Sequence, residues 1–429
     1  MKLTTTTALQ IHQIFRQGSV ILTAILLAKS SLSTVEIGIY ETLLFIGTTF
    51  SVFLINGLLQ TTIIFYSTMI KEQKAKMAFN IFFVFSCLSL FIFLTLFFLK
   101  TPVLIFLTGH ADLPYFNLFI VYLLLNLPPF LLESLWTVDN RPLSILGFSV
   151  LSNLFLIVAV VLPLRLGMGL EGSLKGMILV AFVRYILLII NILRTGRWKI
   201  DAQIILTFLL MSLPLIIYST IGSFVTAFSS WLINWHYSGD KEVFAIFRYG
   251  AREFPLALAL ATGLSSAMIP VLKENTEGGL LILKTKSRTL AHLLFPISVV
   301  LMLFTEGVFR LVFNPQFMAS VPIFRIYLLL LTSRILFPQS ILLALKETKM
   351  MLLISIIETV SIIILSFILI YPMGIAGVAW ATVLGFLLEK ILIIVYLKKQ
   401  HNIDFRSYTE ANWYGFYCFI LILSYVLLL

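Results

Sequence analysis

The sequence is poor in charge. Of its 429 residues only 11% are charged, whereas 60% are apolar or aromatic and the mean hydropathy is +1.05. A soluble domain carries roughly a quarter charged residues, so much of the polar surface that water requires is missing. The composition therefore excludes an ordinary water-soluble protein and predicts that lipid surrounds most of the chain.

Cysteine is almost absent, and so are long polar segments. Cys87 and Cys418 are the only two cysteines, and both lie inside apolar runs. They give no disulfide framework, metal-ligand spacing or thiol nucleophile. The connections outside the apolar runs carry no acid–base or nucleophile constellation. We therefore expect no metal, no cofactor and no enzymatic activity, although a membrane enzyme such as a polysaccharide polymerase or ligase stays as the alternative from another class.

Long apolar runs separated by short polar breaks fill the rest of the chain. They lack the strict polar–apolar alternation of a membrane β-barrel, so helices are the expected spanning elements. A helix needs about 20 apolar residues to cross a bilayer. About thirteen runs qualify, at residues 12–30, 36–66, 79–99, 115–136, 143–164, 172–193, 203–233, 241–270, 287–308, 320–345, 350–371, 375–397 and 411–428. The predicted fold class is an all-α integral membrane protein.

Basic residues gather in alternate loops. One set contains Lys2, Lys71, Lys74, Lys76, Arg141, Arg194, Arg197, Lys199, Lys273, Lys284, Lys286, Arg288, Lys346, Lys349, Lys398, Lys399 and Arg406, and the opposite set only Lys29, Lys100, Arg165, Lys241 and Arg310. The positive-inside rule then places the N-terminus in the cytoplasm. We expect the protein to be a multi-pass protein of a bacterial inner membrane. The rule also explains the formal charge of +11 without a nucleic-acid partner.

Landmarks recur along the chain at a nearly constant spacing. Gly57-Leu58 matches Gly263-Leu264 at an offset of 206, and the Gly169–Gly172 turn resembles Gly374–Gly377 at 205. The spacing predicts two six-helix bundles, residues 1–198 and 199–400, followed by an extra helix within 401–429. Six helices per copy give both copies the same orientation, an arrangement that transporters use to form a central cavity between two halves.

Charges inside the predicted eighth span carry the functional argument. Arg248 and Arg252 are four residues apart and would share one face of a continuous helix. Glu253 neutralises only part of that charge, and Pro255 is expected to kink the helix just beyond. Two arginines at membrane depth favour an anion-binding cavity, because an unpaired charge in lipid costs about 2.5–3.5 kcal/mol or more.

A structural explanation competes with this one, in which both arginines pair with acids on neighbouring helices. The candidate acids are Glu41, Glu358 and Glu389. Arg16 in the first span has no acid before Glu36, so it either snorkels to the cytoplasmic interface or faces the cavity.

Further charges recur in both halves. Arg184 and Lys390 stand 206 residues apart, which indicates a cation at the same level of each half. Lys390 is expected to pair with Glu358. These two residues, with Glu41 and Glu253, are expected to be structural charges or to couple transport to an ion. Arg325 and Arg334 are nine apart and face opposite ways, and we expect Arg334, the deeper one, to face the cavity.

An aromatic residue and one further pair of charges also lie within the predicted spans. Tyr249 lies between the two span-eight arginines and could contact a sugar, although aromatic residues at span ends more often anchor a protein at the membrane interface. Glu306 and Arg310 are expected to form a structural pair across one helical turn.

The stretch Phe-Arg-Tyr-Gly-Ala-Arg-Glu-Phe-Pro (Phe247 to Pro255), the Gly-x-x-Gly turns and the two parallel halves resemble the MOP exporter superfamily. Within it the chain looks most like Wzx-type flippases of O-antigen and capsule assembly. The resemblance implies translocation of a polyprenyl-diphosphate-linked oligosaccharide between membrane leaflets, in lipopolysaccharide or capsule biosynthesis. It admits a polysaccharide polymerase and chain-length machinery as partners.

The resemblance also leaves two alternatives open. One is a lipid II-type flippase, in which arginines of spans one and eight face the cavity; Arg16, and Arg252 or Arg248, are the matching positions. The other is a cation-coupled multidrug exporter of the same fold, which needs buried acids for its cation. The first span, residues 12–30, contains none.

Overall fold

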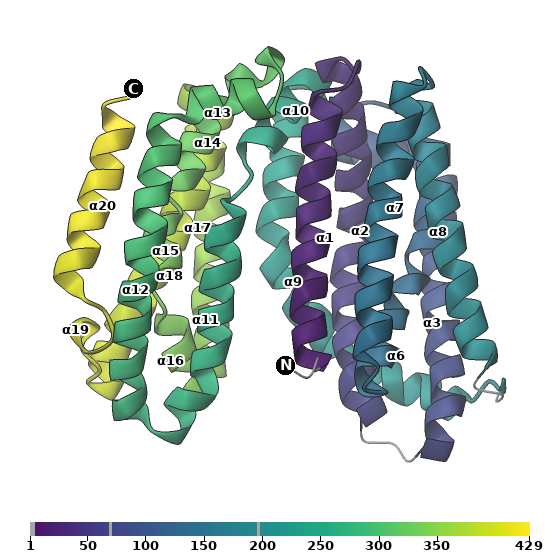
Figure 1. Ribbon diagram of the computed structural model, residues 1–429, viewed down its shortest axis with the longest axis horizontal. Helices are drawn as coiled ribbons and strands as arrows, with labels where there is room; N and C mark the ends of the chain where they lie inside the picture. The colour runs from purple at the N-terminus through teal and green to yellow at the C-terminus, as the bar shows by residue number, and fades with distance from the viewer. Residues whose placement is uncertain (1–4, 68–70, 195–197) are drawn as a thin grey trace. The chain divides into compact units, whose positions relative to one another are not determined.

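The computed structural model describes residues 5–67, 71–194 and 198–429, and its regular elements there are helices, without a strand (Figure 1). Eleven of the helices in these ranges are long and apolar enough to cross a membrane. Three shorter apolar stretches accompany them, including Ala411–Val426 at the C-terminus. The prediction of an all-α, multi-pass membrane protein is confirmed.

The chain divides into two compact units, Met1–Ala245 and Ile246–Leu429. The first contains α1 (Thr5–Ala28), α2 (Thr34–Ser67), α3 (Lys71–Phe98), α4 (Lys100–Thr108), α5 (Phe116–Asn126), η1 (Pro128–Phe130), α6 (Leu131–Val138), α7 (Pro142–Arg165), α8 (Gly169–Leu193) and α9 (Ala202–His236). The division falls inside α10 (Lys241–Gly250).

The second unit holds the remaining helices. They are α11 (Pro255–Glu274), α12 (Thr276–Leu303), α13 (Thr305–Val312), η2 (Pro315–Ser320), α14 (Val321–Leu328), α15 (Leu331–Arg334), α16 (Pro338–Ala344), α17 (Thr348–Met373), α18 (Ile375–His401), α19 (Phe405–Tyr408) and α20 (Ala411–Val426). Its core is built from apolar side chains of α11, α12, α16, α17 and α18, together with Tyr408 of α19.

The compact units do not end where the sequence repeat ends. The repeat places residues 199–400 in the second half, but α9 packs along α2 and belongs to the first compact unit. The division at residue 198 rests on the sequence repeat alone, and it stays a prediction.

Corresponding turns in the two units share an unusual backbone. Asn140 and Lys346, 206 residues apart, both have positive φ angles of 54° and 63°. Gly169 and Gly374, 205 apart, have φ angles of 62° and 58°. Positive φ is uncommon for residues other than glycine, so its recurrence at the predicted offset supports a duplicated unit. A positive φ angle is sterically unfavourable for Lys346, which has a Cβ atom, but not for Gly374, which has none.

Several spans expected to be continuous are broken. The predicted helix over 241–270 ends at Gly250 and restarts at Pro255, so residues 251–254 are not helical. Proline disfavours helical geometry in the preceding residue, which explains a complete break where the sequence suggested a kink. The predicted span 320–345 is divided into α14, α15 and α16. The predicted span 115–136 is likewise interrupted, by the Pro128–Phe130 turn between α5 and α6.

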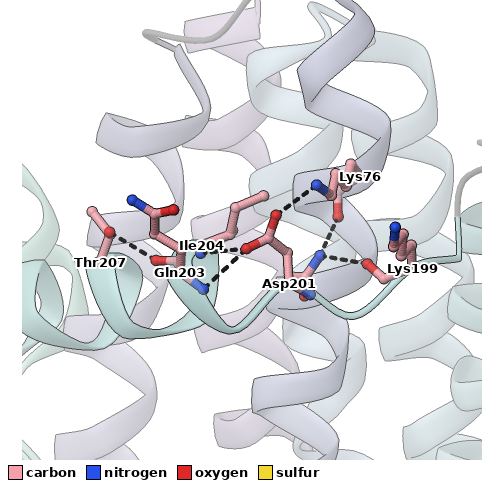
Figure 2. A network of polar contacts seen from close by, with 7 residues as sticks. Lys76, Lys199, Asp201, Gln203, Ile204 and Thr207 are labelled. Atoms are coloured by element: carbon pink, nitrogen blue, oxygen red, sulfur yellow. Dashed lines mark hydrogen bonds and ion pairs between the residues drawn. The ribbon is translucent and has the colours of Figure 1, made fainter.

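Asp201 fixes the start of α9 against α3 (Figure 2). Its carboxylate accepts hydrogen bonds from the backbone N–H groups of Gln203 and Ile204 and lies 2.5 Å from the Lys76 ammonium. Asn80 of α3 accepts a bond from the Asp201 N–H at 2.8 Å and donates to the Lys199 carbonyl at 3.0 Å. The connection into α9 is thus held by side chains of α3.

This contact predicts a pH effect. The Lys76 ammonium and the Ile204 N–H hold the pKa of Asp201 below its ordinary value. A lowered pKa contributes stability that is complete above the unfolded pKa and is lost as pH falls through the folded value. We expect acidification to lower the thermal unfolding midpoint less in Asp201→Asn than in the wild type, because asparagine caps the helix without titrating. Identical pH profiles for the two proteins would contradict this role.

Candidate substrate-binding site

The break between α10 and α11 is held in place by the η2–α14 segment. Gly250 ends α10 where a Cβ atom would lie 2.7 Å from the Ser320 carbonyl oxygen and from Ile323 Cβ. The Ser320 hydroxyl donates a 2.7 Å hydrogen bond to the Ile246 carbonyl. Close backbone approach and this bond fix the end of α10, so the residues that follow leave the helix at a defined point.

Arg252 lies on a ladder of aromatic rings. Its guanidinium carbon is 4.6 Å from the centre of the Tyr249 ring, a cation–π distance. Tyr249 in turn stacks on Phe317 at 4.2 Å and meets the edge of Phe313 at 5.5 Å. Tyr249 is fully buried, so its ring supports Arg252 here and presents no open face to a sugar. A substrate contact by Tyr249 stays a prediction.

The two span-eight arginines do not share a helix face in the way that the sequence suggested. Arg248 lies in the last turn of α10, whereas Arg252 follows the end of that helix, so the four-residue spacing rule does not apply across them. Both are half-buried. Arg248 lies within electrostatic range of Tyr327 of α14. The correction moves Arg252 from a helical position to a non-helical segment.

Glu253 binds Arg334 by two hydrogen bonds. Arg334 Nε and Nη2 donate to the two carboxylate oxygens at 2.5 and 2.9 Å. The Arg334 guanidinium also lies 4.5 Å from the centre of the Phe386 ring in α18. Bidentate geometry fixes both side chains. Arg334, expected to face a cavity, is neutralised in this structure by an acid 81 positions away in the sequence.

A double-mutant cycle measures this pair. Both side chains are partly exposed, at 23% and 18%, so we expect a coupling energy of about 1–3 kcal/mol, below that of a fully buried pair. Glu253→Gln and Arg334→Gln should each lower the thermal unfolding midpoint of the wild type. Each substitution should have a smaller effect when the partner residue has already been replaced. Strictly additive effects would show that the pair does not couple.

Lys390 has a different partner from the one predicted. Its ammonium lies 3.0 Å from the adjacent Glu389 carboxylate, and both side chains are almost fully buried. Gln339, at the start of α16, donates a short hydrogen bond to the other Glu389 oxygen. The expected pair with Glu358 is therefore wrong for this structure. Glu358 of α17 is 8% exposed and lies within electrostatic range of Glu389, Lys390 and Arg334.

Glu306 also differs from its expected role. It lies 3.1 Å from Arg325 of α14, so its ion pair joins two segments rather than one turn to Arg310. Arg325 additionally donates to the Leu428 carbonyl at 3.4 Å, which attaches the end of α20. These contacts are structural.

The first unit contains a half-buried cation of its own, Arg184. Arg184 of α8 donates to the Ser152 carbonyl at 2.8 Å and to the Asn126 side chain at 3.3 Å, linking three helices. Glu41 of α2 is also buried, at 2% exposure. Arg16 is exposed on α1 and donates to Gln13 one turn away at 3.0 Å. Substrate roles for Arg16 and Arg184 stay predictions.

Two polar residues of the first unit, His12 and Glu133, were not predicted from the sequence to form a contact. His12 of α1 is 2% exposed, and its Nε2 atom lies 2.9 Å from Glu133 of α6. Arg184 is within electrostatic range of the same glutamate. Glu133 is the one acid in the predicted span 115–136, and a search for isolated acids within spans would have found it. His12 gave no such signal.

Known structures share this fold over nearly the whole chain. "Lipid II flippase MurJ, inward closed conformation" is 17% identical, with a TM-score of 0.71 over 97% of this chain and 96% of that one. A MOP superfamily transporter from Pyrococcus furiosus is 14% identical, with a TM-score of 0.57 over 91% and 92%. The MATE multidrug transporter DinF-BH is 18% identical, with a TM-score of 0.52 over 93% and 94%.

These likenesses establish the fold. The chain has the architecture of MOP-superfamily transporters and flippases. No protein-family model and no curated sequence matches it. These likenesses do not identify a substrate.

Proposed function

We propose that the chain is a flippase that moves a polyprenyl-diphosphate-linked oligosaccharide from the cytoplasmic to the outer leaflet of a bacterial inner membrane. The observation that carries the proposal is the placement of Arg248 and Arg252 at the break between α10 and α11. A diphosphate is a compact dianion, and arginine binds its oxygens by paired charge-assisted hydrogen bonds.

The break suits such a ligand for a second reason. A helix end leaves backbone N–H and C=O groups outside the helical pattern, and membrane transporters use such interrupted helices for binding. Glu253, in the non-helical residues 251–254, has both carboxylate oxygens bound to Arg334.

The wider function follows from this ligand. We infer that surface polysaccharide assembly, of the O-antigen or capsule kind, supplies the substrate and that the polyprenyl tail stays in lipid during alternating access. The asymmetry of basic loops supports a cytoplasmic N-terminus. A polysaccharide polymerase and chain-length machinery would receive the product. A lipid II-type substrate shares the diphosphate and differs in the group that the diphosphate carries.

Reconstitution tests the proposal against the drug-exporter alternative. Purified chain in liposomes should move a fluorescent polyprenyl-diphosphate oligosaccharide between leaflets, measured as accessibility to an external quencher. The same liposomes should not accumulate or release an organic cation dye faster than empty ones do. Dye transport without lipid flipping would assign the chain to multidrug export.

A further inference from the structure

Three carboxylates lie in the interior of the second unit, and two of them have clear partners. Glu253 is bound by Arg334 through two hydrogen bonds, and Glu389 by Lys390 and Gln339. Within the part of the chain that the structure describes, no hydrogen bond or ion pair reaches the carboxylate of Glu358, although it is only 8% exposed. It is also the single acid of α17, inside a candidate membrane span.

An ionised carboxylate without a partner is costly at this depth. A charged side chain within a bilayer costs at least about 2.5–3.5 kcal/mol, and such groups pair, bind an ion or lose their charge. Glu389 and Lys390 of α18 and Arg334 of α15 are the charged groups within electrostatic range of Glu358. Glu389 repels a charge on Glu358, whereas Lys390 and Arg334 attract it but are already engaged by other acids.

The Lys390 ammonium is thus one positive charge that either of two carboxylates, Glu389 or Glu358, could attract. It lies 3.0 Å from Glu389 and within electrostatic range of Glu358, which extends from the neighbouring helix of the same hairpin. When Lys390 pairs with Glu389, Glu358 must be neutralised in another way. A metal cation is disfavoured there, because Lys390 and Arg334 already bring two positive charges close to the site. A proton neutralises the carboxylate without adding a separate cation.

We propose that Glu358 is a proton-binding site, and that Lys390 exchanges from Glu389 to Glu358 when the proton leaves. The protonated state is the one in this structure, with Lys390 on Glu389. Release converts the Glu358 carboxylic acid to carboxylate and a proton that passes to water, while Lys390 remains an ammonium. The exchange changes the contacts between α18 and α17, next to Arg334. The proton site itself does not depend on the proposed function. A coupling of proton release at Glu358 to transport does rest on the proposed function.

Infrared spectroscopy of the purified chain in lipid tests the site without substrate. A protonated carboxylic acid has a carbonyl stretching band distinct from that of a carboxylate, and the band shifts in heavy water. We expect the wild type to show this band at neutral pH and Glu358→Gln to lack it. Glu306→Gln, which alters an exposed acid paired with Arg325, should retain it.

A second variant tests the exchange itself. Glu389→Gln removes the competing acid, so Lys390 becomes available to Glu358 and the band should disappear at the same pH. Persistence of the band in Glu358→Gln, or its absence from the wild type, would overturn the proton site. Persistence in Glu389→Gln would overturn the exchange. Because no substrate is present, each of these failures is distinct from failure to flip a lipid-linked glycan.

Discussion

Cells that carry the double variant Arg248→Ala and Arg252→Ala are expected to lose export of the lipid-linked glycan while inserting the protein normally. Two guanidinium groups at the α10–α11 break are removed, and with them the donors proposed for the diphosphate. A loss of about 3 kcal/mol of binding per charge-assisted contact lowers transport at least about 100-fold. Surface glycan labelling measures export, and membrane fractionation measures insertion.

Matched variants separate binding from general loss of charge. Arg310→Ala removes an exposed arginine of α13 and should leave export unchanged. Arg252→Lys keeps the charge and the position over the Tyr249 ring but loses the planar donor pair, so partial activity is expected. Export at the wild-type level in the double alanine variant would refute the arginine site.

Gly377→Ala is expected to be the most damaging single methyl addition in the second unit. A Cβ atom at this position would lie 2.1 Å from the Leu369 carbonyl oxygen and 2.5 Å from its carbon, where α17 and α18 meet. These are backbone atoms, so the helices must separate, at a cost of about 3 kcal/mol. Thermal stability in detergent, followed by size-exclusion chromatography, should fall by several degrees.

A second glycine provides the control for this effect. Gly263 of α11 has no atom within 4 Å of the position that a Cβ would take. Gly263→Ala should therefore leave stability unchanged or raise it, because alanine is the better helix former. Equal stability of the two alanine variants would show that the α17–α18 approach is looser than the structure indicates.

Hydropathy predicted the helical architecture, because apolar runs are a signal local in sequence. The Gly169 and Gly374 turns share a positive φ, as a repeat would require, but the two six-helix bundles stay a prediction. The same rules failed at Gly250, where the Pro255 signal was taken as a kink and the helix in fact ends. Whether a proline kinks or terminates a helix depends on what packs against it, here the Ser320 carbonyl and Ile323.

Partner choice among the charges could not be predicted from spacing. Arg334 selects Glu253 across 81 positions, and Lys390 selects its immediate neighbour Glu389 in place of Glu358. Helical periodicity states which residues share a face, but rotamers and a third group, such as Gln339 on Glu389, decide which atoms meet. The pairing of His12 with Glu133 is another contact set by tertiary packing alone.

The direct test of the account is the affinity of the purified chain for prenyl lipids that differ only in their head group. Binding should be strong for the diphosphate, weaker for the monophosphate and weakest for the uncharged alcohol, and Arg252→Ala should remove most of the difference between them. Equal affinity for all three lipids, or an unchanged preference in Arg252→Ala, would contradict recognition of an anionic head group by the arginines at the α10–α11 break.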